Sequence, residues 1–165
     1  MLLEGSCHCI AVRFSLHSHT PYPYAHCYCS ICRKTAGSGG SGIFLLGLAE
    51  TLKIEGDENI TRYQAKMDDG SVSPAERSFC NRCGSQLWLF DPRWPEHLHP
   101  FASAFDTPLP KPPAFLDYFL SSRAPWTVPH EGDAIERLEG PIASAWKTGT
   151  GSGGCGWNKS RSRRP

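Results

Sequence analysis

The chain has 165 residues, of which 17 are basic and 16 are acidic, and a formal net charge of +1. This length fits one domain with a tail, and the balanced charge excludes a strong general attraction to nucleic acid or to anionic membranes. The first residues, MLLEGSCHC, lack the features of a secretory signal, and no run of about 18 apolar residues is present to span a membrane. We therefore expect a cytoplasmic protein, or one in another reducing compartment, with no membrane partner.

Short alternating or apolar segments predict a mostly β protein. Strands are expected, in chain order, at residues 12–16, 43–46, 52–55, 60–66, 86–90, 97–105 and 115–120. Helix signals are few: one short turn at residues 29–35, and a second helix at residues 132–138 capped by Asp133. The 14 prolines and 16 glycines fit many short strands joined by tight turns.

The composition changes near Gly140. Residues 148–156 are rich in Gly, Ser and Thr, and the last residues, KSRSRRP, are basic. We expect residues 1–139 to form the folded domain and residues 140–165 to form a disordered tail. So few basic residues are weak grounds for a nucleic-acid partner. Cys155 stands alone in this tail and is expected to be a free thiol.

The other seven cysteines fall in three clusters: CHC at residues 7–9, CYCSIC at residues 27–32 and CNRC at residues 80–83. Disulfides are the alternative interpretation, but a reducing compartment opposes them. Gaps of one or two residues also suit a shared metal ion better than cross-links. Zinc in structural sites takes four tetrahedral ligands and favours thiolates. The cysteine spacing therefore predicts zinc.

Seven sulfurs divide naturally as four plus three. Two pairs complete one closed site, while the C-x-C-x-x-C triple supplies three ligands and leaves a fourth position for an exchangeable ligand, as in catalytic zinc sites. The spacing alone leaves the pairing open, because a competing division places four ligands from the first two clusters on one ion. Gly84 follows the C-x-x-C turn and suits a backbone conformation that other residues avoid.

These motifs and their order resemble the family of the glutathione-dependent formaldehyde-activating enzyme and centromere protein V, which has a β-tent fold. The resemblance covers about residues 3–138. Its matching segments are GSCHC at residues 5–9, VRF at 12–14, HCYCSICRK at 26–34, RSFCNRCG at 77–84, FDTP at 105–108 and APW at 124–126. The resemblance therefore implies a mostly β, zinc-binding β-tent domain of short antiparallel strands with little helix.

The resemblance also resolves the pairing, and it implies two zinc ions per chain. The structural zinc would be held by Cys7, Cys9, Cys80 and Cys83, and the zinc of catalytic type by Cys27, Cys29 and Cys32. Because metal binding at a closed site is coupled to folding, loss of one structural ligand should unfold much of the domain. Ile10 departs from the family pattern, which often has Gly after the second cysteine, so a different turn geometry is expected there.

A zinc ion with three thiolates carries a net negative charge before its fourth ligand binds. Such a site is a weak Lewis acid and favours a soft sulfur ligand, which loses its proton there and can attack a carbonyl carbon. Arg33 and Lys34 follow the triple directly. They are candidates for offsetting its charge or holding a substrate carboxylate, and ordinary surface charges are the alternative. His26 is a candidate supporting partner of the site or a surface histidine.

The family's reaction joins formaldehyde and glutathione to give S-hydroxymethylglutathione, and it is classed as a carbon–sulfur lyase. The resemblance implies a zinc-dependent lyase of this kind, with a small-molecule thiol such as glutathione, or its aldehyde adduct, as the partner. One alternative is a non-catalytic zinc-binding module for a protein or chromatin. Another is a redox sensor whose triple loses zinc and forms a disulfide. The intact triple favours the enzyme, because a scaffold needs only the structural site.

Overall fold

The computed structural model describes residues 1–19, 24–36, 38–132 and 134–142. Its strands are β1 (Leu2–Ser6), β2 (Arg13–His17), β3 (Tyr24–Cys27), β4 (Gly42–Phe44), β5 (Gly47–Leu48), β6 (Lys53–Glu55), β7 (Ile60–Lys66), β8 (Val72–Cys80), β9 (Gln86–Phe90), β10 (His97–Pro100), β11 (Phe115–Tyr118) and β12 (Ile135–Arg137). The one α-helix in these residues is α1 (Ser30–Ala36), and short 3-10 turns lie at Ala49–Thr51, Asp57–Asn59, Ala102–Ala104 and Leu120–Ser122. The predicted mostly β class with little helix is confirmed.

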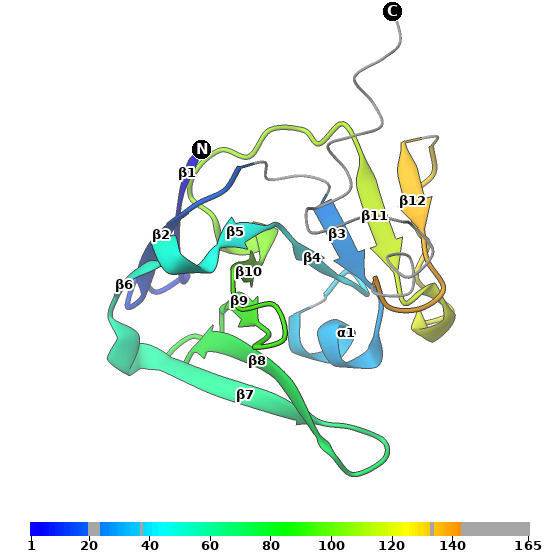
Figure 1. The fold of residues 1–165 in the computed structure, drawn as a ribbon, viewed down its shortest axis with the longest axis horizontal. Helices are drawn as coiled ribbons and strands as arrows, with labels where there is room; N and C mark the ends of the chain where they lie inside the picture. Colours follow the sequence, from blue (N-terminus) through cyan, green and yellow to red (C-terminus); the bar gives the residue numbers. More distant parts are fainter. Residues whose placement is uncertain (20–23, 37, 133, 143–165) are drawn as a thin grey trace, which may run out of the picture.

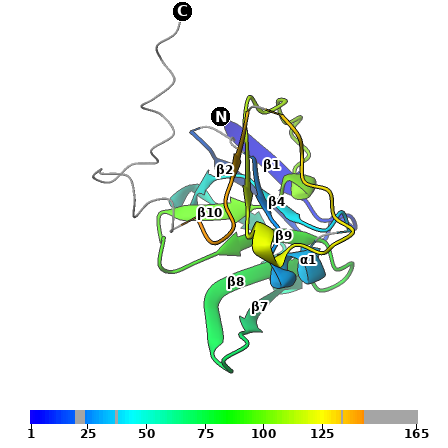
Figure 2. The same cartoon turned by 90° about the vertical axis from the view of Figure 1, so that its right-hand side faces the viewer.

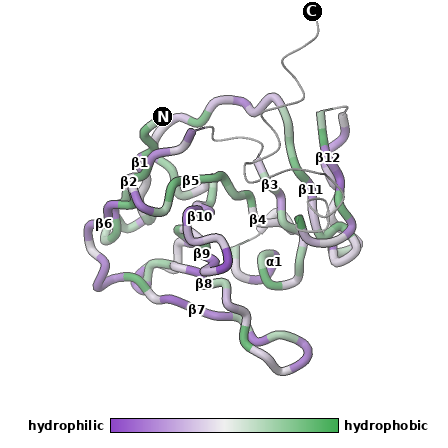
Figure 3. The backbone as a smooth tube through the Cα atoms, in the orientation of Figure 1, coloured by the Kyte–Doolittle hydropathy of each residue, from purple (hydrophilic) through white to green (hydrophobic). Residues whose placement is uncertain are grey.

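The strands form three sheets, with orders β1-β2-β6, β5-β10-β9-β8-β7 and β12-β11-β3-β4. In Figure 1 the first and third sheets lie on opposite sides of the domain, and the second sheet runs across below them. Paired strands are antiparallel, except that β11 runs parallel to both β3 and β12. The hairpin of β7 and β8 projects away from the other elements (Figure 2), and hydrophilic residues follow one another along β7 (Figure 3).

The first sheet forms because apolar residues alternate along its strands. Leu3, Phe14 and Leu16 are buried, whereas the residues between them face outward or are half-buried. Gly5 pairs with Phe14, and a Cβ at Gly5 would lie 2.3 Å from the carbonyl oxygen of Ala104. Only glycine therefore permits this close approach of β1, which carries the chain directly to the first cysteine cluster.

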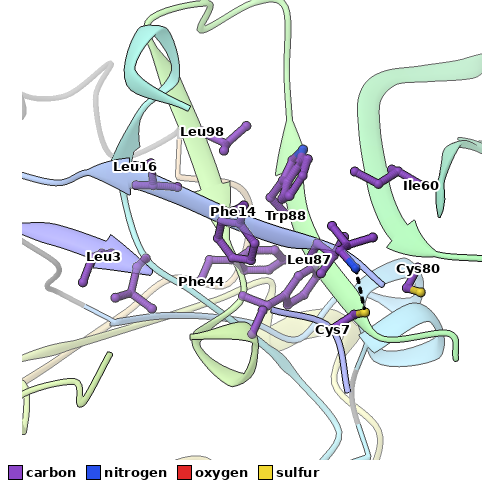
Figure 4. Packing of buried hydrophobic residues seen from close by; sticks show 14 of the residues in the cluster. Leu3, Cys7, Phe14, Leu16, Phe44, Ile60, Cys80, Leu87, Trp88 and Leu98 are labelled. Carbon is purple, nitrogen blue, oxygen red and sulfur yellow. Dashed lines mark hydrogen bonds between the residues drawn. The ribbon is translucent and has the colours of Figure 1, made fainter. Parts of the chain in front are cut away.

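An aromatic core joins the sheets. The rings of Phe14 and Trp88 meet edge to face, with centroids 5.2 Å apart, and Cys7 and Cys80 lie at the edge of this cluster (Figure 4). Cys27 and Cys32 belong to the same buried cluster. Both groups of cysteines are therefore anchored in one hydrophobic core.

The helix expected at residues 132–138 is wrong, because Ile135–Arg137 forms strand β12 beside β11. Its backbone gains hydrogen bonds there, including one from the N–H of Leu138 to the carbonyl of Asp117 at 2.8 Å. An isolated helix of this length is marginal, so pairing at the sheet edge prevails. The strand expected at residues 97–105 ends at Pro100, and a 3-10 turn at Ala102–Ala104 follows.

The described residues contain no helix with the length and apolar character needed to cross a membrane. The expected tail begins at Gly140, and most of it, including Cys155, lies outside the described residues. The division into a domain at residues 1–139 and a tail at residues 140–165 therefore stays a prediction.

Candidate metal centres

The first cysteine cluster joins two parts of the chain that are far apart in sequence. Cys7 and Cys9 lie in the loop after β1, Cys80 ends β8, and Cys83 lies in the next turn. Their four sulfurs lie within 4.8 Å of one another, with Cys9 3.5 Å from Cys7 and 3.7 Å from Cys80. Tetrahedral ligation at about 2.3 Å places sulfurs about 3.8 Å apart. The cluster therefore has the size that one thiolate-bound ion needs.

Backbone and side-chain donors surround these sulfurs. The N–H of Val12 donates to Cys7 Sγ at 3.3 Å, and the N–H of Arg82 donates to Cys80 Sγ at 3.4 Å. Hydrogen bonds from the hydroxyl and backbone of Ser85 lower the pKa of Cys83 to about 5. Such donors stabilise the thiolate, the form of cysteine that binds a metal ion.

Two residues beside this cluster adopt a left-handed backbone conformation. Gly84 has φ +75°, as the turn predicted, and Ile10 has φ +62°. Ile10 stands where the family often has glycine, so a β-branched side chain occupies a conformation that favours glycine. The N–H of Ile10 still donates to the carbonyl of Cys7 at 2.9 Å. The departure in sequence therefore strains the turn but removes no cysteine from the cluster.

The second cluster lies where β3 leads into α1. Cys27 ends β3, Cys29 is in the connection, and Cys32 is in α1. Their sulfurs also lie within 4.8 Å of one another; Cys27 and Cys32 are buried, and Cys29 is partly exposed. Hydrogen bonds from the thiols of Cys27 and Cys32 lower the pKa of Cys29 to about 2, while the same contacts raise the pKa of Cys27. These contacts favour the thiolate form of Cys29, which is the form of cysteine that binds a metal ion.

Two further side chains contact the triple, and the sequence reasoning gave neither a role. Arg77 in β8 is 5% exposed, and its Nη2 lies 4.0 Å from Cys32 Sγ. Within the described ranges no carboxylate is in ion-pair distance of Arg77, and its Nε has no hydrogen-bond partner. A signal was present in the sequence, because Ser73, Ala75 and Arg77 alternate along the buried face of β8. A cation on such a face indicates a partner of opposite charge.

Tyr118 is the second of these side chains. It pairs with Cys27 across β11 and β3. Burial, the nearby charge of Cys27 and a hydrogen bond with its sulfur raise the pKa of Tyr118 well above its usual range. Tyr118 is therefore a neutral hydroxyl at neutral pH and can donate a hydrogen bond at the triple.

The two basic residues predicted beside the triple differ in position. Arg33 is half-buried in α1, and its Nε is buried without a hydrogen-bond partner among the residues described. Lys34 is exposed. Among the described residues, no hydrogen bond joins the side chain of Arg33 or of Lys34 to a cysteine sulfur.

A shallow groove of about 450 Å³ lies elsewhere on the molecule. It is lined by Ala49, Glu50, Leu52, Ile54, Arg62, Glu76, Trp88, Phe90, Pro95 and Leu98. No cysteine of either cluster lines this groove, so the groove is separate from both candidate metal centres.

Known proteins resemble this chain in sequence and in fold. The family described as glutathione-dependent formaldehyde-activating enzyme matches residues 2–120. A protein of Halomonas elongata, whose name assigns it provisionally to these enzymes, is 59% identical over 126 residues, which are 76% of this chain and 80% of that protein. A crystal structure of a Rhodobacter sphaeroides protein has a TM-score of 0.53 at 25% identity, covering 66% of this chain and 92% of that one. The chain therefore belongs to the glutathione-dependent formaldehyde-activating enzyme family.

Proposed function

We propose that this chain is a zinc-dependent enzyme of the carbon–sulfur lyase class that joins glutathione to formaldehyde, giving S-hydroxymethylglutathione. The observation that carries the proposal is the cysteine triple, which combines a partly exposed sulfur on Cys29 with the buried cation of Arg77 and the neutral hydroxyl of Tyr118. The name of the Halomonas relative supports this choice of reaction.

The proposal assigns two zinc ions to the chain. Cys7, Cys9, Cys80 and Cys83 would enclose a structural ion, since four thiolates complete a tetrahedron. Cys27, Cys29 and Cys32 would hold the second ion with three ligands. When bound at the triple, zinc supplies a soft position at which an incoming thiol gives up its proton.

The reaction forms one carbon–sulfur bond. The electron pair of the thiol sulfur attacks the carbonyl carbon, the π pair moves to the oxygen, and that oxygen takes up a proton, so the thiol and aldehyde together give the hydroxymethyl product. Tyr118 is suited to donate a hydrogen bond to the oxygen as charge develops there. Arg77 offsets the negative charge of the three thiolates, which favours entry of an anionic sulfur.

Glutathione also carries carboxylates that need partners. Arg33 lies in the helix that begins at the triple, and its Nε has no hydrogen-bond partner in the described structure. A planar guanidinium matches a carboxylate in a bidentate arrangement. We assign Arg33 and, more peripherally, the exposed Lys34 to the substrate carboxylates.

The test is formaldehyde consumption in the presence of glutathione, followed by exchange NMR so that the uncatalysed reaction is measured in the same sample. The zinc-loaded protein should accelerate the exchange, and Cys29→Ser should return it to the uncatalysed rate. Cys155→Ser, which removes the cysteine that belongs to none of the three sequence clusters, is the matched control and should behave like the wild type.

Absence of acceleration with glutathione and with other small thiols would contradict the enzyme assignment. The non-catalytic binding module would then be the better account of the chain. Acceleration with another thiol but not with glutathione would support the proposed type of reaction and contradict glutathione as its substrate.

A further inference from the structure

A third group of metal-ligating side chains lies on the sheet that carries the triple. His26 in β3 and Asp117 in β11 pair directly, and His130 comes from the segment before β12. One ligand atom from each lies within 4.8 Å of the other two. Strands β3 and β11 lie side by side (Figure 1). Cys27 and Tyr118 are the next residues along these strands, and because side chains alternate along a strand, they point to the opposite face of the sheet.

The centre of this group holds two buried polar atoms without hydrogen bonds. His26 is 1% exposed and Asp117 is 0% exposed, and His26 Nδ1 lies 3.0 Å from Asp117 Oδ1. Despite this distance, neither atom makes a hydrogen bond within the described part of the chain. Leaving such atoms unsatisfied in the interior costs about 1–3 kcal/mol each. A cation between them satisfies both atoms at once.

The surrounding side chains hold this group in place. The Tyr28 hydroxyl donates to Asp117 Oδ2 at 3.5 Å, which leaves Oδ1 for another partner. The ring of Phe115 stacks on His130 with an interplanar angle of 8°, and the guanidinium of Arg137 donates to the His130 carbonyl. Such outer contacts orient ligands around metal ions.

We propose that His26, Asp117 and His130 bind a divalent transition-metal ion. With ligand distances of about 2.1 Å, the 3.0 Å between His26 Nδ1 and Asp117 Oδ1 corresponds to an angle of about 90° at the ion. Two imidazoles and a carboxylate at such angles suit an ion that completes its coordination with water. His130 is exposed, which provides the route of entry.

This site is independent of the proposed reaction. It uses no cysteine, and His130 lies beyond residue 120, where the family match ends. Its effect would be to fasten the segment around His130 to β3 and β11.

The experiment titrates the full-length, tag-free protein, already loaded with zinc, with Co²⁺. Metal analysis and visible absorption are recorded together, since Co²⁺ bound by nitrogen and oxygen lacks the charge-transfer band of a cobalt thiolate. We expect one equivalent of Co²⁺ without this band and without loss of zinc. His130→Ala should weaken this binding at least about tenfold. His17→Ala, at an exposed histidine in β2, should leave it unchanged.

Three results would overturn the site: no additional equivalent in the wild type, full binding in His130→Ala, or loss of binding in His17→Ala. If Co²⁺ binds only by replacing zinc, so that the thiolate band appears and zinc is lost, no additional site exists and the proposal is likewise overturned. A negative Co²⁺ titration does not change the result expected in the glutathione assay, so the two proposals are tested independently.

Discussion

The guanidinium of Arg77 lies 4.0 Å from the sulfur of Cys32, although the two residues are 45 positions apart in sequence. The contact places a buried cation beside a cluster of three thiols. A zinc ion with three thiolates has a net negative charge, so this arrangement balances charge inside the core.

Replacing Arg77 should therefore weaken zinc binding at the triple. Arg77→Met keeps much of the apolar volume but removes the charge, and we expect the affinity of one zinc ion to fall about 10–100-fold. The zinc affinity of Arg77→Lys, which keeps the charge, should fall less than that of Arg77→Met. Competition with a chromophoric chelator measures both variants. Equal zinc affinity in Arg77→Met and wild type would show that the charge of Arg77 has no part in metal binding.

Tyr118→Phe tests the hydroxyl beside Cys27. The raised pKa of Tyr118 keeps its proton in place, so loss of this donor should lower the catalysed rate about 10-fold or more. Zinc content should not change, because the ring and the cysteines remain. A variant with wild-type kcat and full zinc would remove Tyr118 from the reaction.

Ile10→Gly should stabilise the protein. Ile10 is 48% exposed and has φ +62°, a conformation that costs a side-chain-bearing residue about 1–2 kcal/mol. Part of the relief is offset by the greater freedom of glycine in the unfolded chain, so we expect a net gain of about 1 kcal/mol in the free energy of unfolding. Denaturant unfolding measures it. Ile10→Ala is the control, and an equal gain there would point to removal of exposed apolar surface instead of strain.

His99 in β10 should make stability depend on pH. Burial, with a smaller contribution from the charge of His97, lowers the pKa of His99 to about 4. Because the unfolded chain has a histidine pKa of about 6.5, it binds the proton more readily than the folded chain. The free energy of unfolding is therefore unaffected above pH of about 6.5 and falls as the pH decreases toward 4, by up to about 3 kcal/mol.

Denaturant unfolding between pH 4 and 7 measures this dependence. His99→Gln does not titrate, so its curve should be flatter than that of the wild type across the window. Parallel curves for the two proteins would assign the acid sensitivity to other groups.

The sequence was most informative where local pattern and tertiary context agree. The predicted strands at residues 60–66 and 86–90 have the bounds of β7 and β9, and the short helix predicted at residues 29–35 lies within one residue of α1. Periodicity missed β1, β3, β5, β8 and β12. Two of these, β3 and β12, pair with the parallel strand β11, which lies about 90 residues from β3 and about 20 residues from β12. Such pairing leaves no trace in a short window of residues.

The candidate sites show the same limit. Cysteine spacing and family resemblance indicated the two sulfur groups that the fold brings together. Alternation along β8 signals that Arg77 is buried, but its contact with Cys32 of α1 depends on how β8 and α1 pack. The positions of Tyr118, His26 and Asp117 follow from the register of β11 and β3, which spacing along the chain does not encode. The sequence therefore predicts which cysteines gather in each cluster better than it predicts the side chains that surround them.

The division of sulfurs between two zinc ions is tested most directly by zinc content and folding in two single variants of the reduced protein. Cys29→Ser should contain one zinc ion per chain in place of two and keep the circular dichroism of the wild type, because the cluster that joins β1 to β8 stays closed. Cys80→Ser should lose the cooperative unfolding transition. Equal loss of structure in both variants, or one zinc ion in the wild type, would contradict the account.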